Sequence, residues 1–265
     1  GHPLEGASRE DLAAFPWPEP IVDEALLESW VSEARRLREE TGYVVIAQHP
    51  VFGIVELGCW MCGYSDFMLR LAGDPDFVRD FFERVLAIQL AVSESYYRAL
   101  SGLVELTTSG DDFGMQSGPL MSPATFRDLV APYFSERIRV TKSLAGCLYW
   151  HHSCGSVSRL LPALLECGVD ILNPVQTSAA EMSPALLKRE FGDALTFWGA
   201  VDIQEFLRTA SPEQVRTETR ELLDVLGADG GYVTAPAHEV QDDVPVENLM
   251  AWIETARARP GTGGR

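Results

Sequence analysis

Short apolar runs alternate along the chain with longer segments in which apolar residues recur at the spacing of a helix. Each run has the length of a buried strand and is followed by a polar loop and then by a helical segment. The runs cover residues 43–47, 104–107, 147–150, 169–172, 195–198 and 231–234. Repetition of strand and helix in this order predicts a parallel sheet whose connections are right-handed crossovers.

The helical segments keep their apolar residues on one face, and several begin with a Ser-Pro pair. Ser caps the first turn with its hydroxyl, and Pro suits the first helical position because its ring presets φ. Helices are predicted over residues 22–41, 77–100, 123–144, 156–167, 184–191, 212–226 and 245–258, with a further helix-like stretch at 56–71.

The number of repeats bears on the fold class, because a closed (β/α)8 barrel has eight βα units in typically ~250 residues, whereas we count about six. Residues 1–40 form a Pro-rich loop and one helix, so two units are missing at the start. Either the chain is a truncated barrel, or a non-standard start replaces those strands. We therefore expect an N-terminal loop and helix segment at 1–40, followed by one α/β domain of the TIM-barrel type at 41–265. This domain lacks or alters the first one or two βα units.

The net charge of -18 repels phosphate groups and so argues against a nucleic-acid partner. No apolar run approaches the ~18–20 residues that span a bilayer, and the start has no basic-then-apolar signal segment. The five cysteines are an odd number, which is typical of reduced thiols in a cytosol. We expect a cytoplasmic protein that binds a small-molecule substrate and no membrane, and a homo-oligomer is compatible with the sequence.

Two strand ends carry side chains that can bind a metal ion. His152 and Cys154 follow one apolar run and, being two residues apart in an extended chain, point the same way. His238 follows a later run and could supply the third ligand of a zinc site that keeps one position open. The alternative is that His152 is a hydrogen-bonded pocket histidine and Cys154 a small buried filler. His151 points the other way and is expected to pack in the core.

Further polar side chains follow the other runs. Asp112 comes after the run at 104–107, where a carboxylate can bind a substrate nitrogen or act as an acid, or else cap a turn. The amide and carboxylate groups expected to bind substrate are Gln116, Asn173, Gln176, Asp202, Gln204 and Gln241. Such a rim suits a heteroaromatic ligand such as a pterin better than the carboxylates of a tetrapyrrole, because no Arg or Lys lines these loops.

Cys59 and Cys62 form a Cys-x-x-Cys pair. A zinc ribbon needs a second such pair, which the chain lacks, and a thioredoxin-like redox pair needs a different βαβ context. We interpret both residues as core cysteines. No Gly-x-Gly-x-x-Gly, Walker or Gly-x-Ser-x-Gly motif supports nucleotide or hydrolase chemistry.

An ordered set of short stretches carries a family resemblance. They are Asp-Phe-Gly-Met-Gln at 112–116, His-Ser-Cys-Gly at 152–155, Gly-Val-Asp-Ile-Leu-Asn-Pro-Val-Gln at 168–176, Phe-Trp-Gly-Ala-Val-Asp at 197–202 and Gly-Gly-Tyr-Val-Thr-Ala-Pro-Ala-His at 230–238. Through these stretches, residues from about 40 to 258 resemble the uroporphyrinogen decarboxylase superfamily. The resemblance implies a (β/α)8 barrel with its site at the carboxyl face.

That superfamily has two chemical branches. Decarboxylases of heme synthesis need no cofactor and use an aspartate and an Arg-rich segment near the N-terminus, which has no match here. Methyltransferases move a methyl group between a corrinoid protein and a thiol or tetrahydrofolate, and their thiol-specific members bind zinc through His-x-Cys and a later Cys. His152 and Cys154 match the first two ligands, and His238 stands where the third Cys would be.

The resemblance therefore implies the methyltransferase branch, with Asp112, His152 and His238 as expected catalytic residues. Its cofactors would be zinc, and a corrinoid on a partner protein or tetrahydrofolate as co-substrate. One alternative is a uroporphyrinogen decarboxylase-like carboxy-lyase that acts on a tetrapyrrole. Another is a non-catalytic binding protein built on a truncated barrel.

Overall fold

The structure, a computed structural model, describes residues 1–258, and the chain forms two compact units. Unit 1 comprises Gly1–Asp112, Met121–His151 and Pro162–Val169. Unit 2 comprises Phe113–Leu120, His152–Leu161 and the chain from Asp170 onward. Residues 1–40 lie within unit 1, and the end of the expected 41–265 domain lies outside the described residues.

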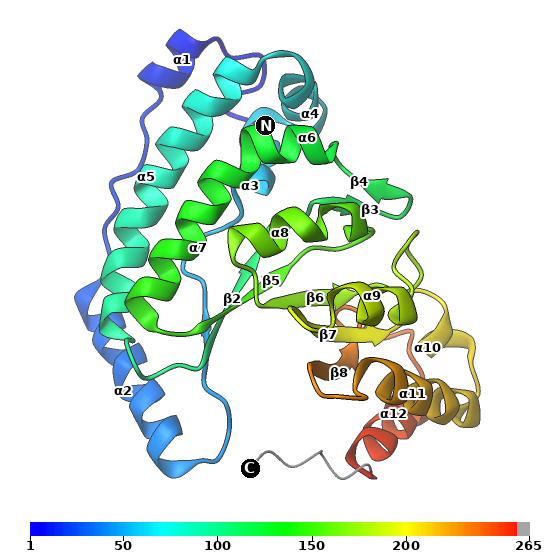
Figure 1. Cartoon of the computed structure of the whole chain (residues 1–265). Coiled ribbons are helices and arrows are strands. Elements are labelled where there is room, and N and C mark those ends of the chain that lie inside the picture. The colour runs from blue at the N-terminus through cyan, green and yellow to red at the C-terminus, as the bar shows by residue number, and fades with distance from the viewer. Residues whose placement is uncertain (259–265) are drawn as a thin grey trace. The chain divides into compact units, whose positions relative to one another are not determined.

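Unit 1 places a layer of helices beside three strands in the order β1-β2-β5, and β1 pairs with β2 in parallel (Figure 1). Its helices are α1 (Arg9–Ala14), α2 (Glu24–Glu40), α3 (Ile54–Cys62), α4 (Tyr64–Gly73), α5 (Pro75–Ala99), α6 (Pro123–Thr125), the π-helical turn η1 (Phe126–Val130), α7 (Ala131–Ala145) and most of α8 (Leu161–Cys167). Its strands are β1 (Ile46–Gln48), β2 (Leu106–Gly110) and β5 (Leu148–His152), whose last residue belongs to unit 2.

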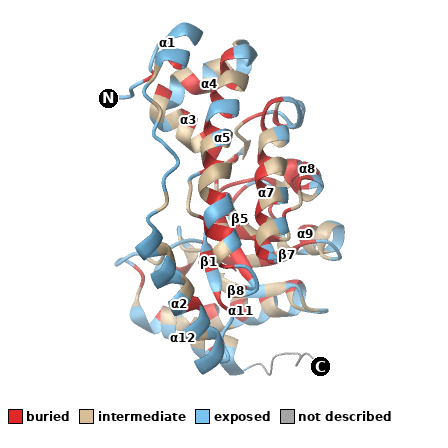
Figure 2. Ribbon diagram, turned by 90° about the vertical axis from the view of Figure 1, so that its left-hand side faces the viewer, coloured by how far each residue is buried: buried red, intermediate tan, exposed pale blue. Residues whose placement is uncertain are grey.

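The core of unit 1 forms around α5, which lies beside α7 (Figure 1). Asp74 caps α5 by accepting a hydrogen bond from the Phe77 N–H, and Pro75 occupies its first turn. Apolar residues at helical spacing bury one face of α5, where Phe81 and Phe82 pack edge-on against Phe67 of α4. The surface helix α2 is exposed along most of its length (Figure 2).

Unit 2 continues the strand–helix repeat, with parallel strands in the order β6-β7-β8. Its strands are β3 (Gly114–Met115), β4 (Gly118–Pro119), β6 (Ile171–Val175), β7 (Thr196–Val201) and β8 (Tyr232–Pro236). Its helices are the 3-10 turn η2 (Ser158–Leu160), α9 (Pro184–Phe191), α10 (Phe206–Thr209), α11 (Pro212–Leu226) and α12 (Val246–Ala258). The Ser211 hydroxyl and the Gln214 side chain form a capping box at the start of α11, as the Ser-Pro signal predicts.

The predicted α/β class and strand–helix order are confirmed, and the described residues form six main strands rather than the eight of a complete barrel. Three details differ from the predictions. The expected helix at 56–71 is two helices, because Gly63 adopts φ +85 between α3 and α4. The helix at 123–144 contains the π-helical turn η1, and an antiparallel β3–β4 hairpin was not predicted.

No helix among residues 1–258 is both long and apolar enough to cross a membrane.

Two glycines of unit 2 allow the His-Ser-Cys-Gly segment to touch the β3–β4 hairpin. A Cβ atom on Gly155, which has φ +78, would lie 2.7 Å from the backbone N and O atoms of Met115. A Cβ atom on Gly114 would lie 2.5 Å from the carbonyl oxygen of Cys154. Real Cβ atoms do not approach backbone this closely, so the two segments can meet only where both residues are glycine.

We predict that Gly155→Ala destabilises the protein by more than Gly230→Ala, as measured by urea unfolding. Both glycines have positive φ, so each substitution costs about 1–2 kcal/mol for the left-handed conformation. Gly230 has open space around it, whereas a Cβ on Gly155 also meets the Met115 backbone. Equal losses for the two variants would show that the close approach is not part of the folded protein.

Candidate functional site

The carboxyl end of β5 carries the first two residues of the candidate site, His152 and Cys154, with Ser153 between them. Ser153 is fully buried, its N–H donates to the Asn173 carbonyl at 2.7 Å, and its Oγ accepts from the Phe113 N–H at 2.8 Å. Because side chains alternate along an extended segment, His152 and Cys154 share the opposite, half-buried side. Cys154 Sγ lies 3.3 Å from His152 Nε2, as the spacing of the two residues predicts.

His238 joins this pair from the end of β8. It follows the strand by two residues, is exposed, and its ring lies edge-on to the His152 ring with centroids 5.6 Å apart. One ligand atom each from His152, Cys154 and His238 lies within 4.8 Å of the others. Unit 2 thus brings together the three residues for which the sequence predicts a metal site.

The donors of this cluster fit a zinc ion. Zinc binds imidazole nitrogen at ~2.0–2.1 Å and thiolate sulfur at ~2.3 Å, so tetrahedral ligand atoms lie roughly 3.3–3.6 Å apart. The 3.3 Å separation between Cys154 Sγ and His152 Nε2 is close to this range, and a ligand atom of His238 lies within 4.8 Å of both. The exposure of His238 leaves one side of the cluster open to solvent, where a fourth ligand could enter.

Asn173, which we expect to bind substrate, contacts the cluster. It lies on β6 and is 8% exposed. Its Oδ1 is 2.7 Å from His152 Nδ1, and its Nδ2 is 3.5 Å from the Trp198 carbonyl on β7. The amide is therefore engaged on both sides by the protein.

Two other expected substrate residues, Gln116 and Gln176, form a chain of amide hydrogen bonds. Gln176 accepts from the Gly155 N–H at 2.8 Å and donates to Gln116 Oε1 at 3.1 Å. Gln116 in turn donates to the Ser178 carbonyl at 2.5 Å. The chain braces the segment that bears Cys154, because it holds the next residue, Gly155.

Asp202, Gln204 and Gln241 have mainly local partners. Asp202 accepts backbone hydrogen bonds from Gln204, Glu205 and Phe206, and so caps the short helix α10. Burial acts to raise the pKa of Asp202, but these N–H donors outweigh it and hold the pKa below its usual value. Gln204 accepts from the Ser178 hydroxyl, and the exposed Gln241 donates to the Glu239 carbonyl.

Asp112 lies in unit 1 and belongs to a different group of carboxyls. Its neighbour Asp111 is fully buried and accepts from the N–H groups of Val55 and Glu56, so it caps α3. Burial raises the pKa of Asp111 to about 6, despite those hydrogen bonds and the buried Arg137 guanidinium. Burial also raises the pKa of Glu56 to about 7, with added repulsion from Asp111 and Asp112.

Glu56 is the titratable group that sequence reasoning missed. The available signal was a single carboxyl in the apolar stretch Ile-Val-Glu-Leu, which places an acid on an otherwise apolar helix. Its partner Asp111 is 55 positions away along the chain, so no local pattern links the two.

Cys59 and Cys62 lie on α3 in unit 1. Burial raises the pKa of Cys59 to about 12 and that of Cys62 to about 11, so both thiols stay protonated near neutral pH. This supports their interpretation as core cysteines. His151 is also fully buried in unit 1, where it packs edge-on against Phe134.

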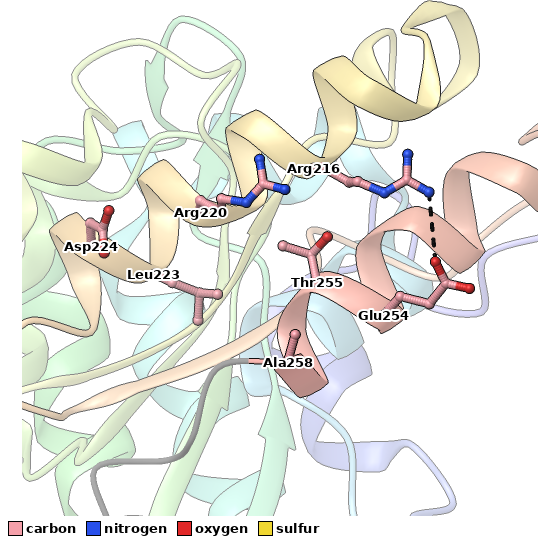
Figure 3. Close-up of a pocket in the computed structure, with 7 residues that line it drawn as sticks. All are labelled: Arg216, Arg220, Leu223, Asp224, Glu254, Thr255 and Ala258. Atoms are coloured by element: carbon pink, nitrogen blue, oxygen red, sulfur yellow. Dashed lines mark ion pairs between the residues drawn. The ribbon is translucent and has the colours of Figure 1, made fainter.

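A separate surface groove of about 550 Å³ lies between α11 and α12 (Figure 3). Its lining residues are Arg216, Arg220, Leu223, Asp224, Glu254, Thr255 and Ala258. Arg216 forms an ion pair with Glu254 at 3.6 Å across the groove. None of the residues predicted for the site lies there, so the strand-end cluster remains the candidate.

The structure defines an α/β protein that carries a His-Cys-His cluster at the carboxyl ends of its strands. The family model for uroporphyrinogen decarboxylase (URO-D) matches residues 5–259. The chain belongs to the URO-D family, as its short stretches predict.

Two relatives are methyltransferases of Methanosarcina mazei. The chain is 28% identical over 145 residues to a methylated-thiol–coenzyme M methyltransferase, a match that covers 54% of this chain and 36% of that protein. A solved structure, a methyltransferase from Methanosarcina mazei, superposes with a TM-score of 0.67 at 20% identity, over 97% of this chain and 70% of that chain. The second likeness shows the fold, and the first places the chain near the methyltransferase branch of its family.

We predict that Glu56→Gln stabilises the protein at pH 8 and has little effect at pH 5. The pKa of Glu56 is about 7 in the folded protein, above its ordinary value of 4.5, so the folded state holds a proton that the unfolded state has released. Stability from this group therefore falls as pH rises from about 4.5 to 7, and an amide avoids that loss. Urea unfolding at both pH values measures the difference.

Glu28→Gln, on the exposed surface of α2, is the matched control and is expected to change stability equally at both pH values. A Glu56→Gln protein that gains nothing at pH 8 would contradict the half-buried position of this carboxyl beside Asp111 and Asp112.

Proposed function

We propose that the chain is a methyltransferase that moves a methyl group between a corrinoid on a partner protein and a small-molecule thiol. The observation that carries the proposal is the cluster of His152, Cys154 and His238, whose ligand atoms lie within 4.8 Å of one another. Membership of the URO-D family and the likeness to a methylated-thiol–coenzyme M methyltransferase support the same chemistry.

His152, Cys154 and His238 would hold zinc, which when bound supplies a Lewis acid that lowers the pKa of a substrate thiol. With Zn²⁺ bound, two neutral imidazoles and one thiolate would leave a net positive charge at the site, which would favour a thiolate over a thiol as the fourth ligand. The substrate thiol would pass its proton to solvent. Its sulfur then forms the new carbon–sulfur bond while the bond between the methyl carbon and its donor breaks, and that electron pair stays with the donor.

The amide network favours a thiol over tetrahydrofolate as the acceptor. A pterin ring needs donors and acceptors that are available to its edge, and Asn173, Gln176 and Gln116 already bond to the protein. Asp202 is likewise engaged by three backbone N–H groups. If the acceptor is tetrahydrofolate, these side chains would have to break their present hydrogen bonds when it binds. His152 would then be a polar residue lining the pocket, and the site would hold no metal.

A decarboxylase acting on a tetrapyrrole would need cationic side chains to meet several substrate carboxylates. Two arginines that follow strands β5 and β7 in unit 2 are already paired with acids. Arg159 bonds to Glu181 at 2.6 Å, and Arg208 bonds to Asp243 at 2.7 Å. This arrangement supports the methyltransferase over the carboxy-lyase.

We predict about one zinc per chain in the purified protein by elemental mass spectrometry, and its loss in Cys154→Ser, because that variant removes the one thiolate of the assigned ligand set. The Cys59→Ala/Cys62→Ala protein is the matched control and is expected to keep its zinc. Methyl transfer from free methylcobalamin to 2-mercaptoethanesulfonate is expected in the wild type and in this control, and to fall to the uncatalysed rate in Cys154→Ser.

Unchanged zinc in Cys154→Ser would refute the assigned ligand set. Turnover with tetrahydrofolate but not with thiol, in a zinc-free wild type, would transfer the proposal to the pterin acceptor. Binding of methylcobalamin without any turnover would support a non-catalytic binding protein.

A further inference from the structure

A buried amide, that of Asn173, contacts the Nδ1 side of the His152 ring. Asn173 Oδ1 lies 2.7 Å from His152 Nδ1, while the other end of the same amide, Nδ2, lies 3.5 Å from the Trp198 carbonyl oxygen. Asn173 is 8% exposed, so water has little access with which to replace either bond.

The Trp198 carbonyl decides which way the amide points. A carbonyl oxygen only accepts hydrogen bonds, so the amide atom that faces it must be the NH2 group. The amide oxygen then faces His152, and because that oxygen only accepts, the ring nitrogen opposite it must carry the proton. His152 is thereby held as the tautomer protonated at Nδ1.

The other ring nitrogen is the one that the cluster needs. With the proton on Nδ1, a lone pair remains on His152 Nε2, which lies 3.3 Å from Cys154 Sγ. The edge-on arrangement of the His152 and His238 rings, with centroids 5.6 Å apart, keeps the third ligand on the same side. In the opposite tautomer, an N–H bond would point at the position a metal must occupy.

We propose that Asn173 is a positioning residue that fixes the tautomer and ring angle of His152, so that Nε2 faces Cys154 and His238 ready to bind metal. The role rests on the proposed zinc-dependent function. An amide suits the task because it supplies the acceptor without adding a second negative charge beside the Cys154 thiolate.

The local register of β6 places the amide where it can act in this way. The pairing of β6 with β7 shifts between Leu172 and Val175, which is the interval that contains Asn173. In the same region of β7, Gly199 has φ +127 and the following Ala200 has φ +88, a conformation that is strained for a non-glycine residue. A strained backbone of this kind persists only where surrounding contacts fix it. Here, side chains that follow β6 or lie on β8 bond to this part of β7.

Those contacts come from Thr177 and Tyr232 as well as from Asn173. The Thr177 hydroxyl donates to the Ala200 carbonyl at 3.3 Å, and the Tyr232 hydroxyl donates to the Gly199 carbonyl at 2.9 Å. Side chains therefore bond to three successive carbonyls of β7. The Trp198 carbonyl orients Asn173, and the next two carbonyls accept from Tyr232 and Thr177.

The test compares Asn173→Leu, which keeps the volume but loses the acceptor, with Asn173→Asp, which keeps an acceptor for the Nδ1 proton. Two properties are measured on the full chain: the tautomer of His152 in the metal-free protein, from its ring 15N chemical shifts, and the affinity for Zn²⁺ in competition with a chelator. The His152 signals are assigned by their loss in His152→Gln.

We predict that the wild type shows the Nδ1–H tautomer and that Asn173→Leu shows a mixture. Zinc affinity should fall about 10–100-fold in Asn173→Leu, the range typical for loss of a partner that orients a metal-bound histidine. Asn173→Asp should restore both properties. Asn248→Leu is the matched control: it removes another buried amide of unit 2, which donates to the Leu207 and Ala210 carbonyls, and should lower stability without changing zinc affinity.

An unchanged His152 tautomer in Asn173→Leu, or an equal loss of zinc affinity in Asn248→Leu, would overturn the positioning role. The outcome is separable from that of the proposed function. If the wild type binds no zinc, the metal-dependent function fails, while the tautomer measurement alone still decides whether Asn173 positions His152.

Discussion

The hydrogen bond from the Ser153 N–H to the Asn173 carbonyl is the contact on which the candidate site depends. It fixes the His-Ser-Cys segment on β6 at one register, with a separation of 2.7 Å. At that register the Asn173 side chain meets the His152 ring, and the Gln176 side chain meets the Gly155 N–H. A shift of one residue would turn every side chain of the segment to the other face, so the cluster would be lost.

Around that hydrogen bond, the polar groups of unit 2 form an inner and an outer set, here called layers. The inner layer is the cluster of His152, Cys154 and His238, in which His238 is exposed. The outer layer consists of amides that bond to one another and to backbone, including Asn173 and the Gln176–Gln116 pair. Such a layer holds the inner side chains in place at little cost, because each buried amide is satisfied by a partner.

The meeting of the three cluster residues could be predicted from the sequence, whereas contacts that depend on the pairing of distant segments could not. The meeting of His152 with Cys154 follows from the two-residue period of an extended chain, and the arrival of His238 follows from parallel strands that end at one edge. The role of Asn173 depends on cross-strand register, which no local pattern contains. The contact of Asp111 with Glu56 joins a strand end to a helix start 55 residues earlier, and it becomes visible only in the folded chain.

The most direct test of the account is zinc K-edge X-ray absorption on the zinc-loaded full chain, before and after addition of 2-mercaptoethanesulfonate. The account predicts two nitrogen ligands at ~2.0–2.1 Å and one sulfur ligand at ~2.3 Å, with a second sulfur when the thiol is present. A shell of nitrogen and oxygen without sulfur would contradict the assignment of Cys154. A shell with one sulfur that does not change on addition of thiol would contradict activation of a thiol at this site.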